Sequence, residues 1–156
     1  MNEATASTLP QRRPRLVWVI FAFVVLTNLH GLVKQVLMLT GSYPVPEGTR
    51  AMYEQLQASR SWFEVLGGMT VLTLNLVAAF LLILLRRQAY HLFAISLLLS
   101  IGSLVIQFAR GGPAATVFAQ STLAFLVMLI ALAIGWSIYA AICVYTWHLR
   151  ERGVLK

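Results

Sequence analysis

The sequence predicts an all-α integral membrane protein, a four-helix bundle with up-down-up-down topology. Hydrophobic residues make up 59% of the 156 residues and charged residues only 11%, against roughly 45–50% and about 25% in soluble domains. The charged residues also gather at the boundaries of four long apolar segments. Both observations are expected of a chain whose middle is surrounded by lipid. The length suits one compact domain rather than two.

Four segments reach the roughly 20 mostly apolar residues that a spanning helix needs. We expect spans at about 16–39, 62–85, 89–109 and 117–147. They define a transmembrane domain at 16–148 between tails at 1–15 and 149–156. The fourth segment is longer than the bilayer requires, so it should tilt or extend into water. The connections at 86–88 and 111–113 are short, which favours antiparallel neighbours.

The longest connection, residues 40–61, predicts a short external amphipathic helix before the second span. Apolar residues recur there at near-helical spacing among polar ones. Two i,i+4 pairs of opposite charge would support the helix, Arg50 with Glu54 and Arg60 with Glu64. Such a helix would lie on the membrane surface or cover the mouth of the bundle.

Basic residues predict that both termini and the second turn face the cytoplasm. The tails and this turn carry Arg12, Arg13, Arg15, Arg86, Arg87, Arg150, Arg152 and Lys156. The opposite side has Arg50, Arg60 and Arg110, offset by Glu47, Glu54 and Glu64. Lys and Arg accumulate in short cytoplasmic loops. Because the basic residues border apolar segments instead of forming one polar face, we expect contacts with the lipid bilayer and none with nucleic acid.

Polar side chains within the spans are the candidates for a ligand site or polar path. They are Asn28, His30, Lys34, Asn75, Ser100 and Gln107. Lys34 lies close enough to the outer end of its span for its stem to snorkel to the headgroups. His30 lies deeper, but the chain has no acid at similar depth, which argues against a proton relay.

The third span has one small, polar face. Ser96, Ser100, Ser103 and Gln107 follow an i, i+4, i+7, i+11 pattern. Small residues also follow one face of the second and fourth spans. Such faces either pack tightly between helices or line a narrow polar cavity, and the frequency of small-residue interfaces favours packing.

Motifs for chemistry are missing from the sequence. Cys143 is the single cysteine, which excludes an internal disulfide and a Cys-x-x-Cys redox pair. The chain has three histidines, and no carboxylate or thiol completes a ligand set with them. We therefore expect no catalytic residues, no metal site, no cofactor and no enzymatic activity.

Three boundary motifs resemble a known group. They are Arg13-Pro-Arg-Leu-Val-Trp-Val-Ile20, Leu85-Arg-Arg-Gln-Ala-Tyr-His-Leu-Phe93 and Leu149-Arg-Glu-Arg-Gly-Val-Leu155. The chain is similar in these motifs to small uncharacterised four-span inner-membrane proteins of Gram-negative bacteria. The resemblance implies the four-span architecture and a location in the bacterial inner membrane, and it implies no activity.

The leading hypothesis from sequence is a non-enzymatic accessory or interaction component of an inner-membrane assembly. The small-residue faces would then serve association with other membrane subunits. The alternative is a small homo-oligomeric transporter or channel, whose path would be lined by the polar faces.

Overall fold

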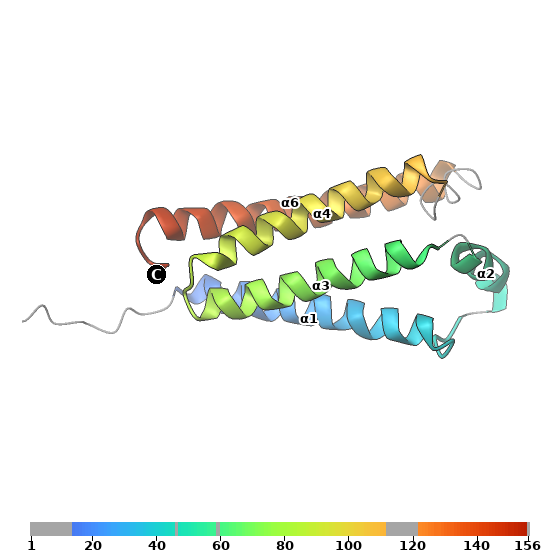
Figure 1. Ribbon diagram of the computed structural model, residues 1–156, viewed down its shortest axis with the longest axis horizontal. Helices are drawn as coiled ribbons and strands as arrows, with labels where there is room; N and C mark the ends of the chain where they lie inside the picture. Colours follow the sequence, from blue (N-terminus) through green and yellow to red (C-terminus); the bar gives the residue numbers. More distant parts are fainter. Residues whose placement is uncertain (1–13, 46, 59, 112–121, 156) are drawn as a thin grey trace, which may run out of the picture.

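The computed structural model describes residues 14–45, 47–58, 60–111 and 122–155 (Figure 1). Its elements are α1 (Arg15–Leu39), η1 (Glu47–Thr49), α2 (Arg50–Ala58), α3 (Trp62–Ile83), α4 (Gln88–Ala109) and α6 (Thr122–Glu151). Within these ranges the chain forms helices and no strands. The predicted all-α four-helix bundle is confirmed, and α2 is the short helix expected before the second span.

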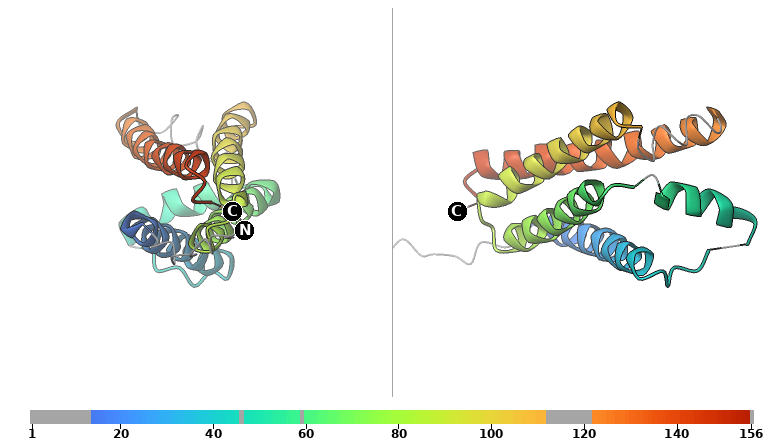
Figure 2. Two further views of the ribbon diagram at one scale, coloured as in Figure 1. Left: turned by 90° about the vertical axis from the view of Figure 1, so that its left-hand side faces the viewer. Right: turned by 45° about the vertical axis from the view of Figure 1, so that its right-hand side comes forward.

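The four long helices pack in chain order, α1 against α3, α3 against α4 and α4 against α6. They form two pairs, α1 with α3 and α4 with α6 (Figures 1 and 2). The pairs lie close together at the end where α1 begins and α6 ends, here called the terminal end. They separate toward the opposite end, which carries α2 and is here called the α2 end.

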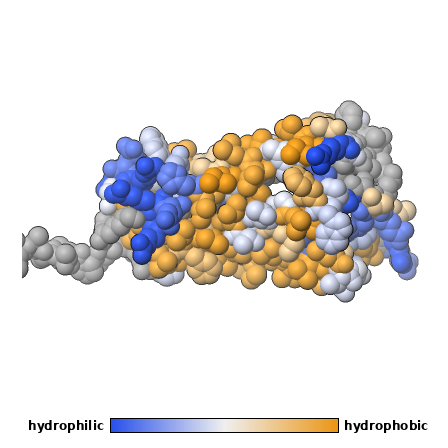
Figure 3. All heavy atoms as spheres, in the orientation of Figure 1, coloured by the Kyte–Doolittle hydropathy of each residue, from blue (hydrophilic) through white to orange (hydrophobic). Residues whose placement is uncertain are grey.

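Large apolar side chains on all four long helices face outward. Leu26, Leu98 and Leu123 are 69–73% exposed. The space-filling view shows an apolar band between two polar ends (Figure 3). All four helices are long and apolar enough to cross a membrane. The chain is a multi-pass membrane protein, because outward-facing leucines on this scale are stable only in lipid.

The close packing is concentrated at the terminal end. Ala78 and Ala79 of α3, together with Ala89 and Phe93 of α4, are fully buried there. Small side chains let the backbones of neighbouring helices approach closely, and the ring of Phe93 fills the space between them. The complete cluster is Val17, Ile20, Val24, Ala78, Ala79, Leu82, Ala89, Phe93, Ile142, Leu149 and Leu155.

A tight turn joins α3 to α4 at the terminal end. The N–H of Arg86 donates to the carbonyl oxygen of Leu81 at 2.9 Å, which closes the last turn of α3. Leu85 has a φ of +54°, a left-handed conformation that costs a non-glycine residue roughly 1–2 kcal/mol. Nε of Arg87 donates to the carbonyl oxygen of Leu155 at 3.2 Å. This bond ties the chain after α6 to the turn.

The observed boundaries refine the predicted spans. The second span ends at Ile83 instead of residue 85, and the fourth continues to Glu151, past residue 147. The predicted start of the fourth span, at about 117, lies outside the described residues. The structure has the Arg50–Glu54 pair, with Nε and Oε1 3.2 Å apart.

The predicted pair of Arg60 with Glu64 is replaced by a capping box at the start of α3. The N–H of Glu64 donates to Oγ of Ser61 at 3.3 Å, and the N–H of Ser61 donates to Oε2 of Glu64 at 3.2 Å. These bonds satisfy N–H groups that have no partner within the helix. The carboxylate of Glu64 therefore caps α3, and Arg60 contacts Met38 of α1 instead.

Candidate functional site

One polar side chain from each long helix meets inside the bundle. We call Asn28 of α1, Asn75 of α3, Ser96 of α4 and Tyr139 of α6 the polar junction. Nδ2 of Asn28 donates to the hydroxyl oxygen of Tyr139 at 2.7 Å. Nδ2 of Asn75 donates to Oδ1 of Asn28 at 3.2 Å, and Oγ of Ser96 donates to Oδ1 of Asn75. The chain of bonds connects all four helices.

The polar junction fixes how the helices are rotated against one another. Asn28, Asn75 and Ser96 are at most 4% exposed, so water does not supply their hydrogen bonds. Nδ2 of Asn28 also donates to the carbonyl oxygen of Val24 at 2.7 Å. Among the described residues, no buried side-chain nitrogen or oxygen lacks a partner. Because a polar group left without a partner in lipid raises the free energy, rotating one helix away from the others is unfavourable.

A cavity of about 540 Å³ separates the helix pairs on the α2 side of the polar junction. A second hollow of about 380 Å³ shares Val71, Leu72, Ser100, Leu132 and Trp136 with it and reaches the polar junction. The opening between the pairs is visible in Figure 3. The larger cavity falls within the roughly 300–1,000 Å³ of sites that hold small molecules.

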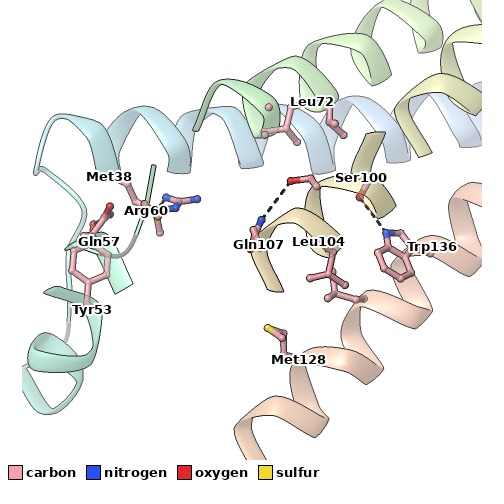
Figure 4. Close-up of a pocket in the computed structure, with 15 residues that line it drawn as sticks. Met38, Tyr53, Gln57, Arg60, Leu72, Ser100, Leu104, Gln107, Met128 and Trp136 are labelled. Carbon is pink, nitrogen blue, oxygen red and sulfur yellow. Dashed lines mark hydrogen bonds between the residues drawn. The ribbon is translucent and has the colours of Figure 1, made fainter. Parts of the chain in front are cut away.

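The cavity draws its walls from every helix in the bundle and from α2 (Figure 4). The lining residues are Met38, Tyr53, Gln57, Arg60, Gly67, Gly68, Val71, Leu72, Ser100, Ser103, Leu104, Gln107, Met128, Leu132 and Trp136. Apolar atoms form most of the wall surface, and seven of these fifteen residues also have a hydroxyl, amide, guanidinium or indole group. This combination is typical of sites that bind and orient a largely apolar ligand.

Two glycines of α3 keep the cavity open. A Cβ added at Gly67 would meet no atom within 4 Å, and one at Gly68 would meet only Nε2 of Gln35, at 3.4 Å. Nε2 of Gln35 donates to the carbonyl oxygen of Val65 at 3.3 Å. This bond keeps α1 in contact with α3 at the level of the cavity. The empty space therefore lies between this pair and the pair formed by α4 and α6.

Polar groups on α4 and α6 stand on the far wall of the cavity. Nε1 of Trp136 donates to Oγ of Ser100 at 3.1 Å, which orients the indole along the wall. Nε2 of Gln107 contacts Oγ of Ser103 at 3.5 Å (Figure 4). The opposite wall has Met38, Tyr53, Gln57 and Arg60.

Among the described residues of this lining, Arg60 is the single charged one. Its Nη1 lies 3.5 Å from Sδ of Met38, a weak acceptor. Nε2 of Gln57 donates to the hydroxyl of Tyr53 at 2.8 Å, so α2 presents an ordered polar surface beside Arg60. The guanidinium, amide, hydroxyl and indole groups of this lining can donate hydrogen bonds to a ligand. Within the described ranges no three His, Cys, Asp or Glu residues are placed to hold a metal ion.

The structure brings four of the six predicted candidates together. Asn28 and Asn75 lie in the polar junction, whereas Ser100 and Gln107 line the cavity. His30 and Lys34 are exposed on α1 and line neither. Nζ of Lys34 lies 5.5 Å from the ring centroid of Tyr43, in the segment after α1. This direction agrees with the expected snorkelling toward the end of the span.

Sequence reasoning missed Tyr139, Trp136 and Arg60 as site residues. Tyr139 and Trp136 lie three positions apart in an apolar span, and both have a polar tip that needs a partner when buried. Their spacing on one helical face was the available signal. Arg60 gave no signal, because in sequence it belongs to a connection between spans.

Comparison with protein-family models, with curated proteins and with solved structures found no match. In its described residues the chain has the fold of a multi-pass membrane protein with four helices long enough to span. A polar junction joins these helices, and a cavity lies on one side of it.

Proposed function

We propose that this chain is a non-enzymatic inner-membrane protein of bacteria that binds a small amphiphilic ligand between its helix pairs. The observation that carries the proposal is the cavity of about 540 Å³ with a mainly apolar wall surface, polar groups on both sides and, among the described residues, one charged group. A mainly apolar wall with polar groups at its edges matches a molecule that is itself partly apolar and partly polar, as a lipid-like amphiphile is.

We also propose that the terminal end faces the cytoplasm and the α2 end faces outward. Support comes from the basic residues of the terminal end: α1 begins at Arg15, the turn from α3 to α4 contains Arg86 and Arg87, and α6 has Arg150 in its last turn. In this orientation the ligand enters from the outer side of the membrane or sideways from its outer leaflet.

The proposal is tested by filling the cavity from Gly67. In Gly67→Leu the new side chain occupies empty space, because no atom lies within 4 Å of its Cβ. Gly102→Leu is the matched control, since Gly102 also lies in a helix with open space around its Cβ but does not line the cavity. Leucine has a higher helix propensity than glycine by up to about 1 kcal/mol, so neither exchange should unfold its helix.

The measurement is native mass spectrometry of the three proteins after gentle extraction from the membrane. We expect wild type and Gly102→Leu to retain a small molecule of constant mass, and Gly67→Leu to lose it. Equal retention by all three proteins, or retention by none, would contradict the proposal. Liposome flux of the molecule identified then separates binding alone from the transporter hypothesis.

A second candidate function is the accessory component of a membrane assembly. Its support is the position of α6, which packs mainly against α4 and leaves Ala133, Ala140 and Ala141 exposed. Small residues on an uncovered helix face suit close approach by another helix. A stoichiometric complex with a different protein in the same mass spectra would favour this function. A monomer or a homo-oligomer without any other subunit would argue against it.

A further inference from the structure

The charge of the cavity is positive and uncompensated at its α2 end. Arg60 is the one charged residue in the described part of the lining. The two acids closest to it in sequence are engaged elsewhere: Glu54 pairs with Arg50, and Glu64 closes the capping box of α3. A cationic ligand would find no counter-charge in this lining. A neutral one would leave the guanidinium without a strong acceptor.

We propose that the ligand is a single-chain amphiphile with an anionic carboxylate or phosphate headgroup, bound at Arg60 with its chain in the cavity. This inference rests on the proposed function and specifies the chemistry of its ligand. Guanidinium groups bind carboxylate and phosphate through paired N–H donors, and these are among the strongest hydrogen bonds in proteins.

The position of Arg60 suits a headgroup. Arg60 precedes the first residue of α3, Trp62, by two positions, so it lies at the membrane interface where amphiphile headgroups reside. Among the described residues its side chain makes one hydrogen bond, a weak one from Nη1 to Sδ of Met38, which leaves strong donors for an anion. Gln57 of α2 lies on the same wall (Figure 4).

The shape of the cavity suits one acyl chain. Between Met128 and Trp136 of α6 the wall extends about 12 Å at the rise of an α-helix. Along this path Leu72, Leu104 and Leu132 provide aliphatic contacts. A space of about 540 Å³ belongs to the size class of sites for one drug-sized molecule, which a lipid with two chains exceeds.

The test compares three probes of equal chain length: hexadecanoate, hexadecan-1-ol and hexadecyltrimethylammonium. Their dissociation constants are measured on the purified full chain in nanodiscs of a neutral lipid. We expect hexadecanoate to bind wild type at least about tenfold more tightly than the alcohol, as a charge-assisted hydrogen bond of typical strength would give. The cationic probe should bind most weakly.

Variants separate the headgroup from the chain. Arg60→Gln should bring hexadecanoate to the affinity of the alcohol. Arg110→Gln should leave the preference intact, because Arg110 lies at the same end, over the ring of Phe63, and outside the cavity lining. Gly67→Leu should weaken the binding of hexadecanoate and of the alcohol together.

The two proposals fail in different ways. Equal affinity of wild type for hexadecanoate and the alcohol, or a preference that survives Arg60→Gln, would overturn the anionic headgroup and leave the ligand cavity standing. If Gly67→Leu weakens the binding of none of the probes, the cavity is not the binding site and the proposed function is wrong. If Arg110→Gln abolishes the preference as fully as Arg60→Gln, the general positive charge of that end is responsible and the assignment to Arg60 is wrong.

Discussion

Asn75 is the central member of the polar junction, and replacing it with leucine should destabilise the bundle by a predictable amount. Its amide donates to Oδ1 of Asn28 at 3.2 Å and accepts from Oγ of Ser96. Hydrogen bonds between membrane helices contribute about 0.6 kcal/mol each on average and at most about 1.7. The loss of both bonds should therefore cost about 1 kcal/mol, and at most about 3 kcal/mol.

A double-mutant cycle isolates the junction from the effect of changing one side chain. Asn75→Leu, Ser96→Ala and the double variant should show a coupling free energy of about 0.6 kcal/mol or more. The control cycle pairs Asn75→Leu with Thr73→Ala. Oγ1 of Thr73 donates to the carbonyl oxygen of Met69 within α3 and is exposed, so its coupling should be near zero.

The assay is reversible unfolding by sodium dodecyl sulfate in mixed micelles, followed by far-ultraviolet circular dichroism. The predicted result is a coupling for the Asn75–Ser96 pair that clearly exceeds the Asn75–Thr73 control. If the two cycles agree within about 0.3 kcal/mol, the usual scatter of additive sites, the junction does not join α3 to α4 and the reasoning is refuted.

Three further changes test other parts of the structure. Tyr139→Phe removes the acceptor for Nδ2 of Asn28, so spin labels on α1 and α6 should report a longer or broader distance at the α2 end; an unchanged distribution would contradict this. Ser61→Ala breaks the capping box at a cost of about 1 kcal/mol, which should appear as faster amide hydrogen exchange of Glu64, and unaltered exchange would exclude the cap. At Leu85, with its φ of +54°, glycine should give a more stable protein than alanine by about 1 kcal/mol, the reverse of the order in a helix. Higher stability of the alanine variant in the same unfolding assay would count against a left-handed residue there.

The fold could be predicted from sequence because the bilayer sets it. Segments of about 20 apolar residues between charged boundaries have few alternatives to spanning helices, and short connections place consecutive helices side by side. Helix ends were less predictable. Leu84 and Leu85 continue the apolar pattern of α3, yet the backbone leaves the helix at Ile83, because the turn to α4 is set by backbone geometry that hydropathy does not record.

The candidate site was predicted only in part. Periodicity places Ser96 and Ser100 on one face of α4, and the frequency of small-residue interfaces favours packing of this face over a cavity. In the structure both occur on this face: Ser96 is packed in the polar junction, whereas Ser100 borders the cavity. The difference arises because small buried residues such as Ala79 close the terminal end, while Gly67 leaves space at the α2 end. How far two helix pairs separate depends on contacts between distant segments.

The central claim, that the space between the helix pairs holds an amphiphile, is tested most directly by photolabelling. A hexadecanoate with a diazirine in its chain would be bound to the chain in nanodiscs, irradiated, and mapped by peptide mass spectrometry. We predict labelling of Leu104 and Met128, which line the cavity, competed by unlabelled hexadecanoate. Labelling confined to outward-facing residues such as Leu98 and Val127, without competition, would show that the probe samples only the lipid surface and would contradict the account.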